Sequence, residues 1–131
     1  MIVDSSAVVA MVREEPGHDD LLTALDRSVT RPMISAVSYV ESAIVLDAQR
    51  DPVLSGRLDQ LLDVFQVEVV PVTTSQARRA REAYRDFGRG SGHLAKLNFG
   101  DVFAYALAAE TGEPLLYKGD DFGHTDVRSA V

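Results

Sequence analysis

Short apolar segments alternate with longer segments of helical character along the whole chain. The apolar segments are Ile2-Val3, Met33–Ser35, Val67–Val70 and Leu115–Lys118. Each has the length and apolar content of a short strand, and we expect the first and the last to be buried. Most of the chain between them carries apolar residues at helical spacing. This alternation predicts a mostly parallel sheet with helices on both faces, so we expect a three-layer α/β/α sandwich.

Helix starts can be predicted from residues that cap the first turn. We expect the first helix to be capped by Ser5 or Ser6, and a later one to begin at Asp51-Pro52, with proline in the first turn. Apolar spacing predicts further helices over His18–Ser28, Ala36–Gln49, Thr73–Phe87 and Val102–Ala109. The tail at Thr125-Asp126-Val127 is a candidate edge strand.

Length and composition indicate one globular domain over residues 1–131. The apolar content of 46% argues against disorder. No charged start precedes a long apolar stretch, and no apolar run approaches ~18 residues, so neither a signal peptide nor a membrane span is expected. The chain has no cysteine, which excludes disulfides and Cys-ligated metals and fits a cytoplasmic location.

Several acidic residues lie directly after predicted strands or within predicted apolar helices. Asp4 follows the first strand and Asp120-Asp121 follow the last, at the strand ends where ligands of parallel sheets bind. Asp101 begins a nearly all-apolar helix, and Glu41 lies inside another apolar helix. Each acid also has a structural explanation, since Asp4 and Asp101 can simply cap helices and Glu41 can lie at a helix rim.

Taken together, the acids predict a metal site built from oxygen ligands. The formal net charge is −7, and a pool of carboxylates is costly unless a cation neutralises it. Without cysteine or a plausible set of histidine ligands, carboxylates favour Mg²⁺ or Mn²⁺.

The positive charges are concentrated in one segment. Nearly half of the 13 cations lie between residues 78 and 96: Arg78, Arg79, Arg81, Arg85, Arg89 and Lys96. Helical spacing puts Arg78, Arg81 and Arg85 on one face, and we expect Ala77, Ala80, Ala83 and Tyr84 to cover the other. Such a face is either solvated or suited to the phosphates of RNA.

Four motifs, in this order and at these separations, resemble the PIN-domain family, and within it the VapC-type toxins of bacterial toxin–antitoxin pairs. They are Ile2-Val3-Asp4-Ser5-Ser6-Ala7, Ser38-Tyr39-Val40-Glu41, Leu97-Asn98-Phe99-Gly100-Asp101 with Tyr105-Ala106-Leu107-Ala108, and Leu116–Phe122 with Thr125-Asp126. The resemblance covers essentially the whole chain.

The resemblance implies a metal-dependent ribonuclease, inhibited by a small VapB-type antitoxin and prone to dimerise. It maps the family's acids to Asp4, Glu41 and Asp101. The fourth is Asp121, with Asp120 as the alternative, because Gly119 stands where many relatives carry the first of two acids. Ser6 and Asn98 correspond to residues that support the site.

Hydrolysis of RNA phosphodiester bonds is therefore the expected activity. Asp4 and Asp101 would be the main metal ligands, Glu41 and Asp121 would hold a second ion or orient waters, and Arg78, Arg81, Arg85, Arg89 and Lys96 would contact RNA. Two alternatives come from other classes: a protein-interaction module with a dormant acid site, and a Mg²⁺-binding phosphoacceptor signalling domain. The apolar helices at Ala36–Gln49 and Leu54–Phe65 also predict a symmetric homodimer.

Overall fold

A four-stranded parallel sheet forms the centre of the computed structural model, which describes residues 1–131. Its strands are β1 (Ile2–Val3), β2 (Met33–Ser35), β3 (Glu68–Val70) and β4 (Leu115–Leu116), in the spatial order β3-β2-β1-β4. The helices are α1 (Ser5–Val12), α2 (His18–Asp26), α3 (Ala36–Asp47), α4 (Pro52–Val64), α5 (Thr74–Phe87) and α6 (Asp101–Thr111), followed by the 3₁₀ helix η1 (Asp121–His124).

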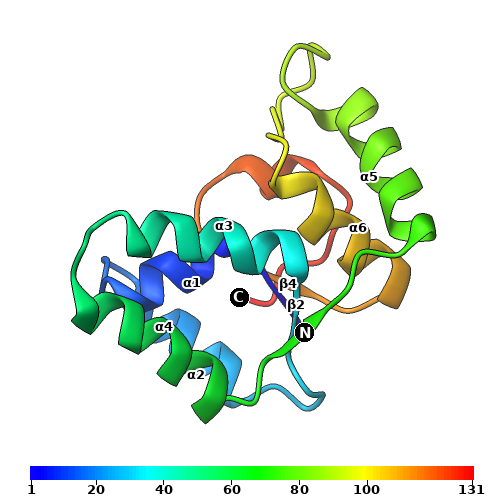
Figure 1. The fold of residues 1–131 in the computed structure, drawn as a ribbon. Coiled ribbons are helices and arrows are strands. Elements are labelled where there is room, and N and C mark those ends of the chain that lie inside the picture. Colours follow the sequence, from blue (N-terminus) through cyan, green and yellow to red (C-terminus); the bar gives the residue numbers. More distant parts are fainter.

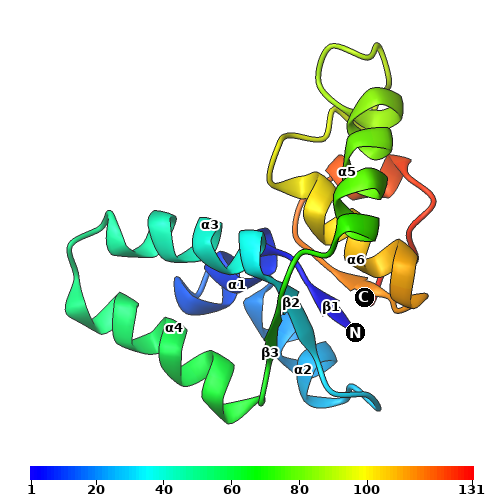
Figure 2. The same cartoon turned by 45° about the vertical axis from the view of Figure 1, so that its right-hand side comes forward.

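Helices cover both faces of the sheet, which confirms the predicted three-layer arrangement (Figures 1 and 2). Side chains alternate across each strand. Ile2 and Leu115, paired in register, join the core beneath α5 and α6. Val3 and Leu116 point the other way, into the core built from α1 to α4. The two-residue period of the strands thus supplies two separate apolar layers.

Side-chain caps begin four of the helices. Asp51 caps α4 just before its first-turn proline and Thr73 caps α5, as their sequences predict. For α1, however, the prediction of Ser5 or Ser6 was wrong. Asp4 is the cap, and both serines lie inside the helix. Because Asp4 directly follows β1, the chain turns from strand to helix within a single residue.

Smaller differences from expectation lie at element ends. Two helices stop two residues before their predicted ends, α2 at Asp26 and α3 at Asp47. The tail forms no strand at residues 125–127. Instead, Ser129 makes an isolated parallel bridge to Leu115, after η1 has carried the chain past the end of β4.

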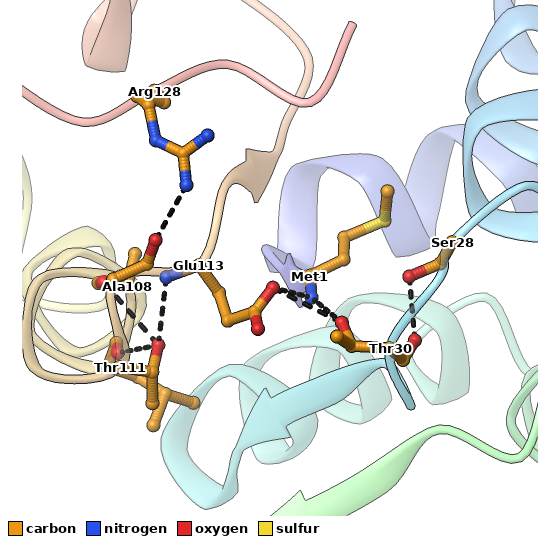
Figure 3. Close-up of polar contacts among 9 residues, drawn as sticks. Met1, Ser28, Thr30, Ala108, Thr111, Glu113 and Arg128 are labelled. Atoms are coloured by element: carbon orange, nitrogen blue, oxygen red, sulfur yellow. Dashed lines mark hydrogen bonds and ion pairs between the residues drawn. The ribbon is translucent and has the colours of Figure 1, made fainter.

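The amino ends of three strands are tied together by polar contacts (Figure 3). The α-amino group of Met1 donates to Oε2 of Glu113 at 2.7 Å and to Oγ1 of Thr30 at 2.9 Å. These residues precede β1, β4 and β2, respectively. The ammonium group holds the pKa of Glu113 below its usual value through this hydrogen bond. This end of the sheet is closed by structural contacts, which leaves the carboxyl ends for a ligand. None of the helices has the length and apolar character needed to cross a membrane.

Candidate active site

The two carboxylate oxygens of Asp4 lie in different environments. Oδ2 accepts hydrogen bonds from the backbone N–H of Ser6 at 2.9 Å and from its hydroxyl at 2.6 Å. Oδ1 is buried and has no hydrogen-bond partner. Helix capping therefore explains only one oxygen, and the other is left available to a ligand.

Ser6 connects Asp4 to the end of the neighbouring strand. Its hydroxyl donates to Asp4 and accepts a hydrogen bond from the backbone N–H of Lys118 at 3.0 Å. Lys118 lies two residues beyond β4, where the chain leaves the sheet towards Asp121. The Ser6 hydroxyl thus fixes the orientation of the Asp4 carboxylate relative to this segment.

Asp101 begins α6 and is 7% exposed. The backbone N–H of Asn98 donates to Oδ2 of Asp101 at 2.9 Å, and the backbone N–H of Asp101 donates to Oδ1 of Asn98 at the same distance. This reciprocal pair holds the carboxylate in place and satisfies a free N–H at the helix start.

Glu41 reaches the same region from the middle of α3. The hydroxyl of Ser5 donates to its Oε1, although the two residues are 36 positions apart. The Glu41 carboxylate also lies directly against the backbone of Gly100, next to Asp101. Sequence patterns did not identify Ser5 or Gly100 as parts of the site. Ser5 enters the sequence analysis as a candidate helix cap and as part of the first motif, and Gly100 enters it as part of the third motif.

The fourth acid lies at the rim. Asp120 and Asp121 are both exposed, and Asp121 begins η1. The charge of Asp121 helps to raise the pKa of Asp101, as do the charges of Asp4 and Glu41. The structure therefore brings Asp4, Glu41, Asp101 and Asp121 within electrostatic reach of one another at the carboxyl ends of β1 and β4.

Burial strongly affects how the two central acids titrate. Desolvation raises the pKa of Asp4 to about 6, against the opposing effect of the Ser6 hydrogen bonds. Desolvation likewise raises the pKa of Asp101 to about 7, although the Asn98 hydrogen bond lowers it. Negative charge here is costly without a cation, as expected where a metal ion or a proton is to be held.

The side chains fit a small hard cation. No three acidic, histidine or cysteine side chains converge as closely as a complete protein cage for a metal requires. Mg²⁺, however, is commonly held by only one or two carboxylates, with waters and substrate phosphates filling the other positions. The unpartnered Oδ1 of Asp4 and the neighbouring Asp101 carboxylate match that donor set, which suits Mn²⁺ equally.

The arginines predicted to share a face of α5 do so. Arg78, Arg81 and Arg85, with Glu82, line a hollow of about 590 Å³. The expectation for the opposite face was wrong in part, because Ala77 and Tyr84 are exposed. The buried strip of α5 consists instead of Gln76, Ala80 and Ala83.

The remaining predicted cations lie in the segment that joins α5 to Asp101. Arg89 and Lys96 are both exposed there. Lys96 has a positive φ of 52°. The segment is anchored where its ends meet, since the backbone N–H of Leu97 donates to the carbonyl of Phe87 at 2.8 Å. The segment 88–100 thus connects α5 directly to the acid site.

Comparison with known proteins places this architecture in a family. Residues 1–128 match the PIN domain. The chain belongs to the PIN-domain family. It is 55% identical over 131 residues to ribonuclease VapC28 of Mycobacterium tuberculosis, which covers 100% of this chain and 98% of the relative. It is 52% identical over 130 residues to ribonuclease VapC42 of the same species, covering 99% and 98%. The resemblance inferred from the four motifs is thereby confirmed.

Solved structures share the fold at lower sequence identity. The crystal structure of VapC20 of Mycobacterium tuberculosis, described as a sarcin-ricin loop cleaving toxin, has a TM-score of 0.71 at 19% identity, covering 97% of this chain and 98% of that one. A toxin–antitoxin complex from Klebsiella pneumoniae has a TM-score of 0.71 at 15% identity, covering 95% and 92%. These likenesses show that the shared fold extends over nearly the whole chain.

Proposed function

We propose that this single PIN-like domain, residues 1–131, is a metal-dependent endoribonuclease and the toxin of a VapBC-type toxin–antitoxin pair. The identity to VapC ribonucleases over the full chain supports the activity class. The observation that carries the metal dependence is the buried, unpartnered Oδ1 of Asp4 beside other carboxylates. A desolvated carboxylate oxygen without a partner is costly unless a cation occupies its place.

Each acid has a distinct task in this proposal. Asp4 and Asp101 hold a Mg²⁺ or Mn²⁺ ion, and Ser6 and Asn98 keep their carboxylates in orientation. Glu41 and Asp121 orient waters on the ion or hold a second one. When bound, such an ion lowers the pKa of a coordinated water and stabilises negative charge on phosphate oxygens.

Binding of RNA requires a positively charged surface, although the net charge of the protein is −7. We assign this task to the arginine face of α5, defined as Arg78, Arg81 and Arg85, together with Arg89 and Lys96. The hollow lined by the arginine face has the charge to receive phosphates flanking the cleaved bond. No ion pair ties down Arg78 or Arg81, whereas Arg85 contacts its neighbour Asp86 at 3.2 Å.

The exposed face of α3 supports self-association. Val40 is 51% exposed and Ile44 is 64% exposed, and both line an apolar groove of about 540 Å³ with Phe99. Val53 and Val64 on α4 are also exposed. We propose a symmetric homodimer through part of these helices, with a VapB-type antitoxin as the second protein partner. Light scattering that finds only monomer at high concentration would contradict the dimer.

The experiment for the activity compares wild-type protein with Asp4→Asn on defined RNAs. We expect cleavage with Mg²⁺ or Mn²⁺, none in excess EDTA, and recovery when the metal is restored. Asp4→Asn should be inactive while keeping the fold, because asparagine also caps helices. If wild-type protein with metal cleaves no RNA but still binds the antitoxin, the alternative of an interaction module with a dormant site is correct.

A further inference from the structure

The place of Glu41 depends on the absence of a side chain at position 100. A Cβ atom on Gly100 would lie 2.5 Å from Cδ of Glu41 and 2.7 Å from its Oε1, and closer still to Oε2. Real Cβ atoms essentially never approach another heavy atom so closely. Any residue other than glycine would therefore force the Glu41 carboxylate out of its position beside Asp101.

Backbone conformation does not explain this glycine. Gly100 has φ −69° and ψ −40°, which any residue adopts, whereas Gly112 has φ 71° and Gly119 has φ 100°. Glycine at a helix start also offers no side-chain cap, unlike Asp4, Asp51 or Thr73 at other helices of this chain. The close approach of Glu41 is the feature that requires glycine here.

Ser5 holds the same carboxylate from another element. Its hydroxyl, at the first position of α1 and 8% exposed, donates to Oε1 of Glu41. Glu41 stands on α3, Ser5 on α1 and Gly100 at the start of α6, so three separate elements meet at one carboxylate. Contacts from α1 and α6 thus limit the rotamers open to a glutamate on a third helix.

We propose that Gly100 and Ser5 are positioning residues that set the Glu41 carboxylate in the acid site before metal and RNA bind. Gly100 provides the space and Ser5 provides the hydrogen bond that keeps the carboxylate in it. The effect on metal binding rests on the proposed function, while the packing claim does not. Without either residue, Glu41 turns away from Asp101, and the site loses the negative charge and the acceptor that Glu41 supplies.

A double-mutant cycle tests this proposal without relying on activity. Gly100→Ala, Ser5→Ala and Glu41→Ala are made singly, and each of the first two is combined with Glu41→Ala. Mn²⁺ affinity is measured by electron paramagnetic resonance, and Tm is measured in EDTA. We expect Gly100→Ala to weaken Mn²⁺ binding about tenfold, the size typical of residues that orient metal ligands, and Ser5→Ala to act in the same direction. In the Glu41→Ala background, neither Gly100→Ala nor Ser5→Ala should weaken Mn²⁺ binding further.

The Tm cycle separates the packing claim from the proposed function. Gly100→Ala should raise Tm less in the wild-type background than in the Glu41→Ala background, because in the wild-type background the added methyl group displaces the Glu41 carboxylate and breaks its hydrogen bond with Ser5. The same substitution should raise Tm in the Glu41→Ala background, because alanine is the better residue at helical angles once the obstacle is gone. The Tm comparison tests the packing claim even if wild-type protein binds no Mn²⁺. A wild-type protein that binds no Mn²⁺ would instead contradict the proposed metal site.

Gly56→Ala is the matched control. Gly56 lies inside α4, and a methyl group added to its Cα would meet nothing within 4 Å apart from its chain neighbours and the backbone of its own helix, so alanine should raise Tm and leave Mn²⁺ affinity unchanged. Two results would overturn the proposal: a Gly100→Ala protein as stable as Gly56→Ala, or losses of Mn²⁺ affinity from Gly100→Ala and Glu41→Ala that multiply fully in the double variant.

Discussion

The two central acids of the site, Asp4 and Asp101, are buried, whereas the arginines of α5 face solvent. Asp4 is 1% exposed and Asp101 is 7% exposed, and burial raises the pKa of both. Arg78, Arg81 and Arg85 are all exposed. Exposed cations cost the fold little, but buried carboxylates oppose folding until a cation arrives. This difference implies that the buried acids lower the stability of the metal-free protein. The exposed arginines should contribute to RNA binding at little cost to stability.

The largest expected effect is on catalysis at the buried acids. Asp101→Asn should reduce RNA cleavage by about 10³-fold, the loss expected when a metal's contribution of several kcal/mol to the transition state disappears. Single-turnover cleavage with saturating RNA measures it. A variant that retains a tenth of wild-type activity would show that Asp101 is not a main metal ligand.

Metal should stabilise the folded protein through these same acids. Adding Mg²⁺ or Mn²⁺ at about 100 times its Kd should stabilise wild-type protein by about 2.7 kcal/mol, because the ion binds only the folded state. Differential scanning fluorimetry with and without metal measures the rise in Tm. Asp101→Asn should lose most of that rise, and an equal rise in both proteins would place the ion elsewhere.

The metal-free protein should lose stability as pH rises. A carboxyl group whose pKa is raised on folding, as for Asp4 from 3.8 to about 6, favours the folded state below the unfolded pKa. That contribution disappears as pH increases through the folded pKa. In EDTA, Asp4→Asn should therefore match wild type near pH 4 and exceed it near pH 7, by on the order of 2–3 kcal/mol. Urea unfolding at both pH values measures the difference, and a constant difference would contradict a desolvated Asp4.

Substitutions on the arginine face should have the smallest effect and a different signature. The triple change of Arg78, Arg81 and Arg85 to alanine should weaken RNA binding and reduce the salt slope by about 2, since three fewer phosphates of a single strand are neutralised. Mn²⁺ affinity should not change. A triple variant with an unchanged salt slope that no longer binds antitoxin would assign the face to the protein partner.

Much of the fold follows from local patterns, whereas parts of the site do not. Apolar segments and apolar residues at helical spacing located all four strands and six helices, although β3 has no fully buried residue. On α5 the pattern misjudged Ala77 and Tyr84, because the helix packs through a narrow strip that includes the polar Gln76. No local pattern indicates that Gln76 is buried, because tertiary packing decides it.

The acids themselves were predicted from sequence, but their surroundings were not. An acid after a strand looks the same whether it caps a helix or binds a ligand. Only the structure separates the two oxygens of Asp4. The contact of Ser5 with Glu41 joins residues 36 positions apart, so it depends on how α1 and α3 pack. The need for glycine at position 100 arises in the same way, from a side chain on another helix.

The most direct test of the acid site is a crystal structure of the protein with Mn²⁺, using the anomalous scattering of the ion. We expect a peak at the carboxyl ends of β1 and β4, in contact with Oδ1 of Asp4 and the carboxylate of Asp101. Asp4→Asn crystals prepared in the same way should lose most of that peak. Two results would contradict the proposed metal site: an ion bound only at other acids, or no ion in contact with Oδ1 of Asp4 at saturating Mn²⁺.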